Sequence, residues 1–255
     1  MLRRDPPGPT DKPPILFVHG AWHGAWCWEP FFLDWFAARG HVTAAVDLTG
    51  HGARGGNPRG ATLGTYVRDV AEAARSMPSQ PVVVGHSMGG AVVQHYLEGF
   101  GAPAGVLLAT SPTHGAWQAA LRVARRAPGA FARANAELRL GPIVEDRDVA
   151  RWLFFRDDDD RPEVEGWLDR LGDESYGAFL GLLVDLPRPD RVATPLLVVA
   201  AEADRVFSVA EQAATAAAHD AELVEVPGAA HDVMLDPDWE MAATAIAEFV
   251  DRRVA

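Results

Sequence analysis

The stretch "PVVVGHSMGGAVVQHYL" (residues 81–97) decides how the chain folds around it. Residues 82–84 are three valines in a row, which is typical of a strand buried on both faces, and the segment after the serine carries apolar residues at helical spacing. The chain therefore turns from strand to helix at Ser87. Gly85 and Gly89 flank this turn, and their lack of a Cβ permits unusual backbone angles and close approach of neighbouring elements. The pattern predicts a serine hydroxyl that points outward above the edge of a sheet.

Short apolar runs with helical segments between them recur along the chain. Strands are predicted at 15–18, 42–46, 82–84, 105–109, 196–200 and 221–226, and helices near 29–39, 62–76, 88–98, 209–218 and 238–253. Strands that alternate with helices predict an α/β fold, a mostly parallel sheet with helices on both faces. A chain of 255 residues suits one domain with a sizeable core, so we interpret residues 1–255 as a single domain.

Residues 112–190 break this alternation, because they contain amphipathic segments such as "WQAALRVARRA" and no convincing strand. The segment begins just after a predicted strand, and ligands bind at the carboxyl ends of strands in such sheets. We therefore expect 112–190 to be an inserted helical cap above the site. Within it, the run "DDDD" at 157–160 is interpreted as a solvated loop or helix start rather than a metal site, because adjacent acids on a flexible turn rarely converge.

Composition excludes several classes of protein. The net charge of −12 repels a phosphate backbone, so we expect no nucleic-acid partner. The single cysteine, Cys27, excludes an internal disulfide and a cysteine-based zinc cluster, and we interpret it as a buried structural thiol. The first 14 residues carry no apolar stretch typical of a signal peptide, and no apolar run approaches a membrane span. We expect a cytoplasmic protein without a membrane partner.

A serine hydroxyl is a poor nucleophile at neutral pH and needs a base, which is itself oriented by an acid. Asp204 follows the strand predicted at 196–200, and His231 follows the last predicted strand, so both lie in loops at the same sheet edge as Ser87. The sequence predicts a catalytic triad of Ser87, His231 and Asp204. Two alternatives stay open at this point: Asp204 caps the next helix, or Glu202 is the acid.

Residues 85–89, "GHSMG", form the G-x-S-x-G pattern of a nucleophile elbow. With a strand before it, a helix after it, and an acid and a histidine downstream in that order, the chain resembles the α/β-hydrolases from about residue 14 to 253. The segment "FVHGAWHGAWCW" (17–28) and the segment "HDVML" around His231 are similar to plant methylesterases and the related hydroxynitrile lyases.

This resemblance implies further roles. In the family, two backbone N–H groups stabilise the oxyanion of the tetrahedral intermediate, and the matching residues here are Met88, after the serine, and Ala21, after the pair His19-Gly20. The related lyases place a lysine directly after the catalytic histidine, whereas this chain has Asp232 there and its only lysine is Lys12.

No cofactor or metal is needed for such a mechanism, because the neighbouring base generates the nucleophile. Three further histidines lie in loops near the same edge, and we interpret them as hydrogen-bonding groups rather than metal ligands: His19, His51 and His86. Asp47, at the start of "DLTGHGARGG", is interpreted as a structural residue.

Together these features predict a serine hydrolase that cleaves carboxylic esters with apolar acyl or alcohol parts through an acyl-enzyme intermediate. Tryptophans concentrate near the oxyanion segment and in the cap, and we expect Trp22, Trp117 and Trp152 to line an apolar pocket. A thioesterase or lactonase would use the same triad. A carbon–carbon lyase is disfavoured by the missing lysine, and a non-catalytic small-molecule receptor stays open because fold does not fix function. The natural substrate and the oligomeric state stay open.

Overall fold

The computed structural model describes residues 1–254 and contains one seven-stranded sheet. Its strands are β1 (Leu2–Arg4), β2 (Ile15–Val18), β3 (Thr43–Val46), β4 (Val82–His86), β5 (Gly105–Leu108), β6 (Leu196–Ala201) and β7 (Glu222–Val226). They are ordered β1-β3-β2-β4-β5-β6-β7, and every neighbouring pair is parallel except β1 with β3. The predicted α/β fold is confirmed. The edge strand β1 was not predicted, because its sequence "LRR" has no apolar run.

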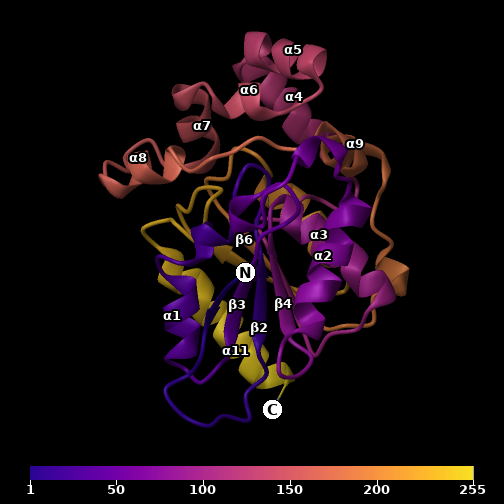
Figure 1. Cartoon of the computed structure of the whole chain (residues 1–255), viewed down its shortest axis with the longest axis vertical. Coiled ribbons are helices and arrows are strands. Elements are labelled where there is room, and N and C mark those ends of the chain that lie inside the picture. The colour runs from indigo at the N-terminus through magenta and orange to yellow at the C-terminus, as the bar shows by residue number, and fades with distance from the viewer. Residues whose placement is uncertain (255) are drawn as a thin grey trace.

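Helices cover both faces of the sheet. They are α1 (Phe32–Ala37), α2 (Leu63–Arg75), α3 (Met88–Gly99), α10 (Val209–Ala218) and α11 (Trp239–Arg253). In Figure 1, α1 and α11 lie on one side of the strands and α2 and α3 on the other. Alternate residues of a strand point to opposite faces, so Phe17 packs in the core with α1 and α11, while Leu16 packs in the core with α2 and α3. The strands are therefore buried on both sides, as their continuous apolar runs indicate.

The side on which successive strands join the sheet changes beside β2. The chain passes from β2 to β3 on one side, with Ile15 opposite Thr43, and then crosses back to β4 on the other, with Ile15 opposite Val82. The connections after β2 and β4 thus leave the sheet in opposite directions. In parallel sheets such a switch point opens a crevice at the carboxyl ends of the strands, which is where ligands bind. Here the switch point places the loop after β2 beside the turn after β4.

The segment between β5 and β6 contains helices and no strand of the sheet within the described residues. The helices are α4 (Trp117–Arg126), α5 (Pro128–Glu137), α6 (Gly141–Val144), α7 (Arg147–Phe154), α8 (Glu163–Leu168) and α9 (Tyr176–Val184). They gather beyond one end of the sheet (Figure 1). No helix in residues 1–254 combines the length and apolar character that a membrane crossing requires.

The acidic run at 157–160 corrects one detail of the sequence interpretation. It lies in the loop between α7 and α8, and Asp157 is exposed as expected, but the side chain of Asp159 is 1% exposed. Asp159 is buried because Arg161 binds it through two nitrogens, at 2.7 and 2.6 Å. Across the described chain, no group of His, Cys, Asp and Glu side chains is arranged to hold a metal ion.

Candidate active site

A single residue, Ser87, separates β4 from α3, and its backbone is strained. Its φ of 54° and ψ of −120° lie in a region that residues with a side chain rarely adopt. The flanking glycines make this turn sterically possible. A Cβ on Gly85 would lie 2.3 Å from the carbonyl oxygen of Gly89, and a Cβ on Gly89 would lie 2.4 Å from that of His19. The elbow therefore packs directly against the loop after β2.

Backbone hydrogen bonds hold the strained serine in place. Its N–H donates to the carbonyl of Leu108 at 3.1 Å, and its own carbonyl accepts from the N–H groups of Gly90 and Ser111 at 2.9 and 3.0 Å. Strained residues persist only where the surroundings over-determine them. These contacts, from the neighbouring strand β5 and from α3, provide that constraint.

The three residues of the predicted triad lie in one chain of hydrogen bonds. The Nε2 atom of His231 is 2.9 Å from the Oγ atom of Ser87, and its Nδ1 atom is 2.8 Å from Asp204 Oδ2. The other carboxylate oxygen of Asp204 accepts from the backbone N–H groups of Val206 and Phe207, at 2.6 and 3.0 Å. The side chains of His231 and Asp204 are 1% and 0% exposed, so water does not compete for these bonds.

The partners of His231 determine where its proton lies. A carboxylate only accepts hydrogen bonds, so Nδ1 carries the proton and the Nε2 lone pair of the neutral ring faces the serine hydroxyl. Burial alone would lower the pKa of His231, but the carboxylates of Asp204 and Asp232 raise it above its ordinary value. The site thus favours the imidazolium that forms when His231 takes a proton.

The alternatives for the acid are separated by position. Glu202 is exposed, and its carboxylate accepts from the N–H of Gly228 at 2.8 Å rather than from His231. The helix α10 is capped by Ser208, whose hydroxyl accepts from the N–H of Glu211 in a capping box. Asp204, and not Glu202, therefore contacts His231, and Ser208, and not Asp204, caps α10.

Two backbone N–H groups beside Ser87 are unused. Within the described residues, neither the N–H of Ala21 nor that of Met88 donates a hydrogen bond. Met88 is the first residue of α3, where backbone N–H groups have no partner inside the helix. Ala21 belongs to the loop after β2 (residues 19–24), called the oxyanion loop here after the role that the family resemblance implies for it. This loop touches the serine so closely that a Cβ on Gly20 would lie 2.9 Å from Ser87 Cβ.

The histidines near this edge make hydrogen bonds that shape the loops. His19 accepts from the N–H of Leu48 at 3.1 Å, and its other nitrogen lies 2.8 Å from the carbonyl of Gly20. His86 donates from Nε2 to the backbone carbonyl of His231 at 2.9 Å. Burial, with the neighbouring His231, lowers the pKa of His86 to about 3, so its ring is neutral.

An apolar cavity of about 70 Å³ lies beside Ser87. The space is small and its lining is almost wholly apolar, which suits a short apolar group. One charged residue, Glu174, is among the residues that line it, and the others comprise Ala21, Trp22, Met88, Ala116, Ala119, Ala120, Val123, Phe131, Leu140, Ile143, Phe179, Leu182, Val206 and Phe207.

Of the three tryptophans expected at the pocket, the structure places only Trp22 there. Trp117 is 59% exposed and donates from its indole nitrogen to the carbonyl of Leu183. Trp152 lies under the guanidinium groups of Arg126 and Arg205 and does not reach the cavity. The prediction from sequence chose tryptophans because large aromatic rings commonly line apolar pockets.

The lining residues of α4 follow a different pattern. Residues 119, 120 and 123 of α4 and residue 116 directly before it have the i, i+3, i+4, i+7 spacing of one helix face, and they are small. Trp117 stands one position off this face, which turns it toward solvent. The spacing was present in the sequence and identifies the cavity wall, together with Phe179 of α9.

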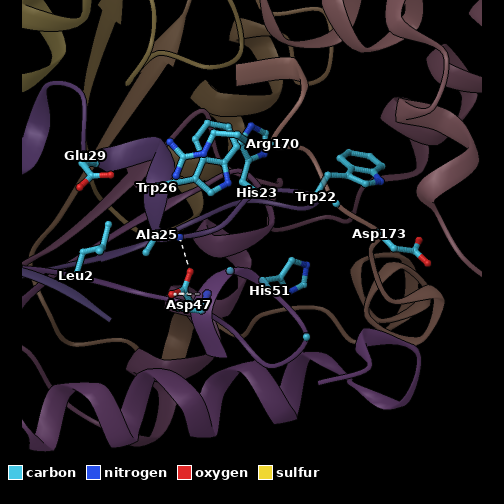
Figure 2. Close-up of a pocket in the computed structure, with 14 residues that line it drawn as sticks. Leu2, Trp22, His23, Ala25, Trp26, Glu29, Asp47, His51, Arg170 and Asp173 are labelled. Atoms are coloured by element: carbon cyan, nitrogen blue, oxygen red, sulfur yellow. Dashed lines mark hydrogen bonds between the residues drawn. The ribbon is translucent and has the colours of Figure 1, made fainter. Parts of the chain in front are cut away.

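A second cavity of about 430 Å³, the polar cavity, also has Trp22 in its lining (Figure 2). His23, Trp26, His51 and Arg170 line it, and no residue of the triad does. Asp47, which also lines it, accepts from the N–H of Ala25 at 2.8 Å, a bond drawn as a dashed line in Figure 2. Asp47 thus fastens the chain after the oxyanion loop to β3.

A buried polar pair, which sequence reasoning missed, joins the walls of the two cavities. Glu174 lines the apolar cavity, His51 lines the polar one, and their side chains approach to 3.1 Å. The hydroxyl of Tyr66 donates to Glu174 at 2.7 Å. Burial lowers the pKa of His51, but Glu174 raises it above its ordinary value. The two residues are 123 positions apart, and no local pattern links them.

Comparisons with known proteins agree with this architecture. The model described as "Alpha/beta hydrolase family" matches residues 15–243. The chain is 33% identical over 89 residues to putative methylesterase 11 of Arabidopsis thaliana (34% of this chain, 23% of that protein) and 35% identical over 97 residues to esterase PIR7B of rice, Oryza sativa (36% and 35%). The alignments thus span about a third or less of the length of these relatives.

A solved structure, an esterase from Thermogutta terrifontis, aligns over 98% of this chain and 93% of its own with a TM-score of 0.75 and 21% identity. At that identity the likeness concerns the fold. The resemblance to plant methylesterases and related esterases that the sequence indicated is confirmed.

Proposed function

The chain belongs to the alpha/beta hydrolase family, and from this premise we propose that it is a serine hydrolase that cleaves carboxylic esters. One observation carries the proposal: the strained Ser87 presents its Oγ atom 2.9 Å from Nε2 of His231, whose Nδ1 is bound by buried Asp204 at 2.8 Å. A hydroxyl in hydrogen-bond contact with an oriented base is an activated nucleophile. Relatives named esterases support the reaction class.

In the first half of the reaction, the Oγ atom of Ser87 attacks the ester carbonyl carbon and its proton passes to Nε2 of His231. Asp204 stabilises the imidazolium that forms. The carbonyl oxygen becomes an oxyanion, and the N–H groups of Ala21 and Met88 donate to it. Such donors favour the transition state because they are already in place when the charge develops.

The intermediate then collapses. The bond from carbon to the alcohol oxygen breaks, and His231 returns its proton to that oxygen, which leaves the acyl group on Ser87. A water molecule enters, gives its proton to His231 and attacks the acyl carbon, and the second intermediate releases the acid and restores the serine hydroxyl. An ester and a water molecule enter this cycle, and an acid and an alcohol leave it.

The cavity beside the serine supports an ester with an apolar part. Val123 and Phe179 contribute apolar wall, and the space of about 70 Å³ suits a short acyl or alcohol group in the closed arrangement of the cap. The rest of the ester, whichever side of the scissile bond it lies on, then extends away from this cavity.

The test combines a covalent probe with an activity screen. A fluorophosphonate should label Ser87, located by mass spectrometry, and the label should be absent from Ser87→Ala and unchanged in Ser79→Ala, a matched change at an exposed serine. Esters, thioesters and lactones of graded size should be hydrolysed by the wild type and not by Ser87→Ala. Label on another serine, or full activity of Ser87→Ala, would contradict the proposal.

A further inference from the structure

Asp232 directly follows the catalytic histidine, at the position where the similar lyases have a lysine, and it does not line the cavity beside Ser87. Its carboxylate instead pairs with the imidazole of His23, with 2.9 Å between Oδ2 and Nε2. Both side chains are 1% exposed. This buried pair joins two loops, and its residues lie 209 positions apart in the chain.

The second nitrogen of His23 reaches the oxyanion loop, where Nδ1 lies 2.7 Å from the carbonyl oxygen of Ala21. Both partners of the ring, a carbonyl and a carboxylate, can only accept hydrogen bonds, so the geometry fits a ring with protons on both nitrogens. In that form His23 is an imidazolium, and Asp232 is the counter-charge that a buried cation needs. Burial would raise the pKa of Asp232, but the facing imidazole of His23, which is hydrogen-bonded to it, lowers that pKa below its ordinary value.

Aromatic rings enclose His23. The Trp26 ring stacks on it at 5.3 Å between ring centres, and Phe154 from the end of α7 meets it edge-on at 5.1 Å. Figure 2 shows His23 beside Trp26, with the side chain of Arg170 over that ring. Little water reaches the ring, and a neutral imidazole would hold one proton for two acceptors.

Asp232 also contacts the loop of the catalytic histidine. Its Oδ1 atom lies 3.8 Å from Nε2 of His86, which donates to the backbone carbonyl of His231. Its backbone N–H donates to the carbonyl of Phe154 at 3.1 Å. Asp232 therefore connects the catalytic loop to the end of α7 through its backbone, and its carboxylate connects that loop, through His23, to Ala21.

We propose that His23 and Asp232 are a positioning pair that holds Ala21 in register with Ser87 and His231, an inference that rests on the proposed function. The carboxylate of Asp232 keeps both protons on His23, and the doubly protonated ring holds Ala21 through its carbonyl. The residue directly after the catalytic histidine thus serves the oxyanion loop rather than the substrate.

The variants Asp232→Asn, His23→Gln and the double variant test this role. Asn at position 232 removes the counter-charge, so the ring of His23 becomes neutral. The bond that this ring donates to the Ala21 carbonyl then loses its charge assistance, and the Ala21 N–H shifts. Each single variant should lower kcat and the rate of fluorophosphonate labelling about 10- to 100-fold, because a misplaced oxyanion donor acts on the transition state, while KM stays within about twofold. The double variant should be no slower than the slower single variant, since both changes break one unit.

The chain offers a matched control pair on α3. His95 has one nitrogen 3.0 Å from the carboxylate of Glu98 and the other 3.0 Å from the backbone carbonyl of Asp185, the same arrangement away from the site. Glu98→Gln and His95→Gln should therefore leave kcat and labelling within about twofold of the wild type, even where they lower the melting temperature.

A second measurement does not depend on activity or on the folding of the single variants. Nitrogen-15 NMR of the histidine side chains should show that His23 carries protons on both ring nitrogens at neutral pH in the wild type. The signals of His23 are assigned as those missing from the spectrum of the double variant. A singly protonated His23, wild-type labelling rates in both folded single variants, or additive effects in the double variant would overturn the pair. Wild type that resists the phosphonate while NMR finds the doubly protonated ring would refute the proposed function, and with it the positioning role, but not the ion pair.

Discussion

The sheet edge and the cap meet at Ser87, and they are built by different physical means. At the edge, residues are held by backbone strain, glycine contacts and buried hydrogen bonds, such as those of Asp204. The cap instead presents apolar side chains of α4 and α9 to the cavity, while its outer surface carries ion pairs such as Arg147 with Glu165. Several independent contacts fix each reactive side chain at the sheet edge, whereas packing alone positions the apolar side chains of the cap.

Because of this difference, we expect the sheet edge to determine reactivity and the cap to determine selectivity. A buried polar group that loses its partner keeps its full desolvation penalty, so a small change at the edge has a large effect. An apolar side chain that is shortened loses stabilisation in proportion to the area removed. We expect changes at the edge to abolish turnover and changes in the cap to shift which ester is preferred.

The largest effect is expected at the acid. Asp204→Asn leaves the shape of the edge intact but removes the charge that orients His231 and stabilises its imidazolium, and it should lower kcat by about 10⁴-fold. The matched change Glu202→Gln, in the same loop but exposed, should have little effect. Steady-state kinetics with one ester would compare the two, and the reverse order of effects would show that the acid is assigned wrongly.

The next effect tests the role of close contact. In Gly89→Ala the new Cβ would meet the backbone oxygens of His19 and Val18 at 2.4 and 2.6 Å, so α3 and the oxyanion loop must separate. We expect kcat to fall about 10²-fold or more and the melting temperature to drop. Gly99→Ala, at the last residue of the same helix, meets nothing within 4 Å and should retain both. If the two variants had the same kcat and melting temperature, close packing at Gly89 would not be needed for turnover.

The dependence of kcat/KM on pH distinguishes the sheet edge from the cap, with a smaller effect than the two substitutions above. Protonated His231 cannot take the serine proton, so kcat/KM should fall about tenfold for each pH unit below its pKa. Because that pKa is raised, the loss should begin at a higher pH than for an ordinary histidine. Asp204→Asn should move this limb to lower pH, whereas the cap variant Phe179→Ala should leave it in place. A limb that moves with Phe179→Ala instead would mean that the cap sets the charge of the edge.

The smallest effects are expected in the cap. Phe179→Ala enlarges the cavity, and each methylene that the extra space buries should gain about 0.8 kcal/mol, a factor near four in kcat/KM, until it is filled. The preferred ester should therefore become longer, measured as kcat/KM across a series of acyl and alcohol lengths, while fluorophosphonate still labels Ser87. Trp117→Ala, on the same cap but outside the cavity, should leave the profile within about twofold. An unchanged profile in Phe179→Ala would show that this wall does not set selectivity.

Local patterns were enough to predict the sheet and its elbow. The strands appear as unbroken apolar runs because both of their faces are buried, and the observed bounds of β2 and β4 begin where those runs begin. The turn at Ser87 was predictable because only residues without a Cβ fit beside it. Asp204 and His231 followed from the rule that loops after parallel strands meet at one edge.

What only the tertiary structure decided were the contacts between distant parts of the chain. Nothing local indicates that Asp232 pairs with His23, that Glu174 reaches His51, or that Trp117 turns away from the cavity. Helical periodicity defines a face but not what that face will meet, and the hydrophobic effect that favours burying a ring has no direction. The sequence by itself determined the backbone frame and the order of the reactive residues. The packing of the cap against the edge decided which side chains surround them.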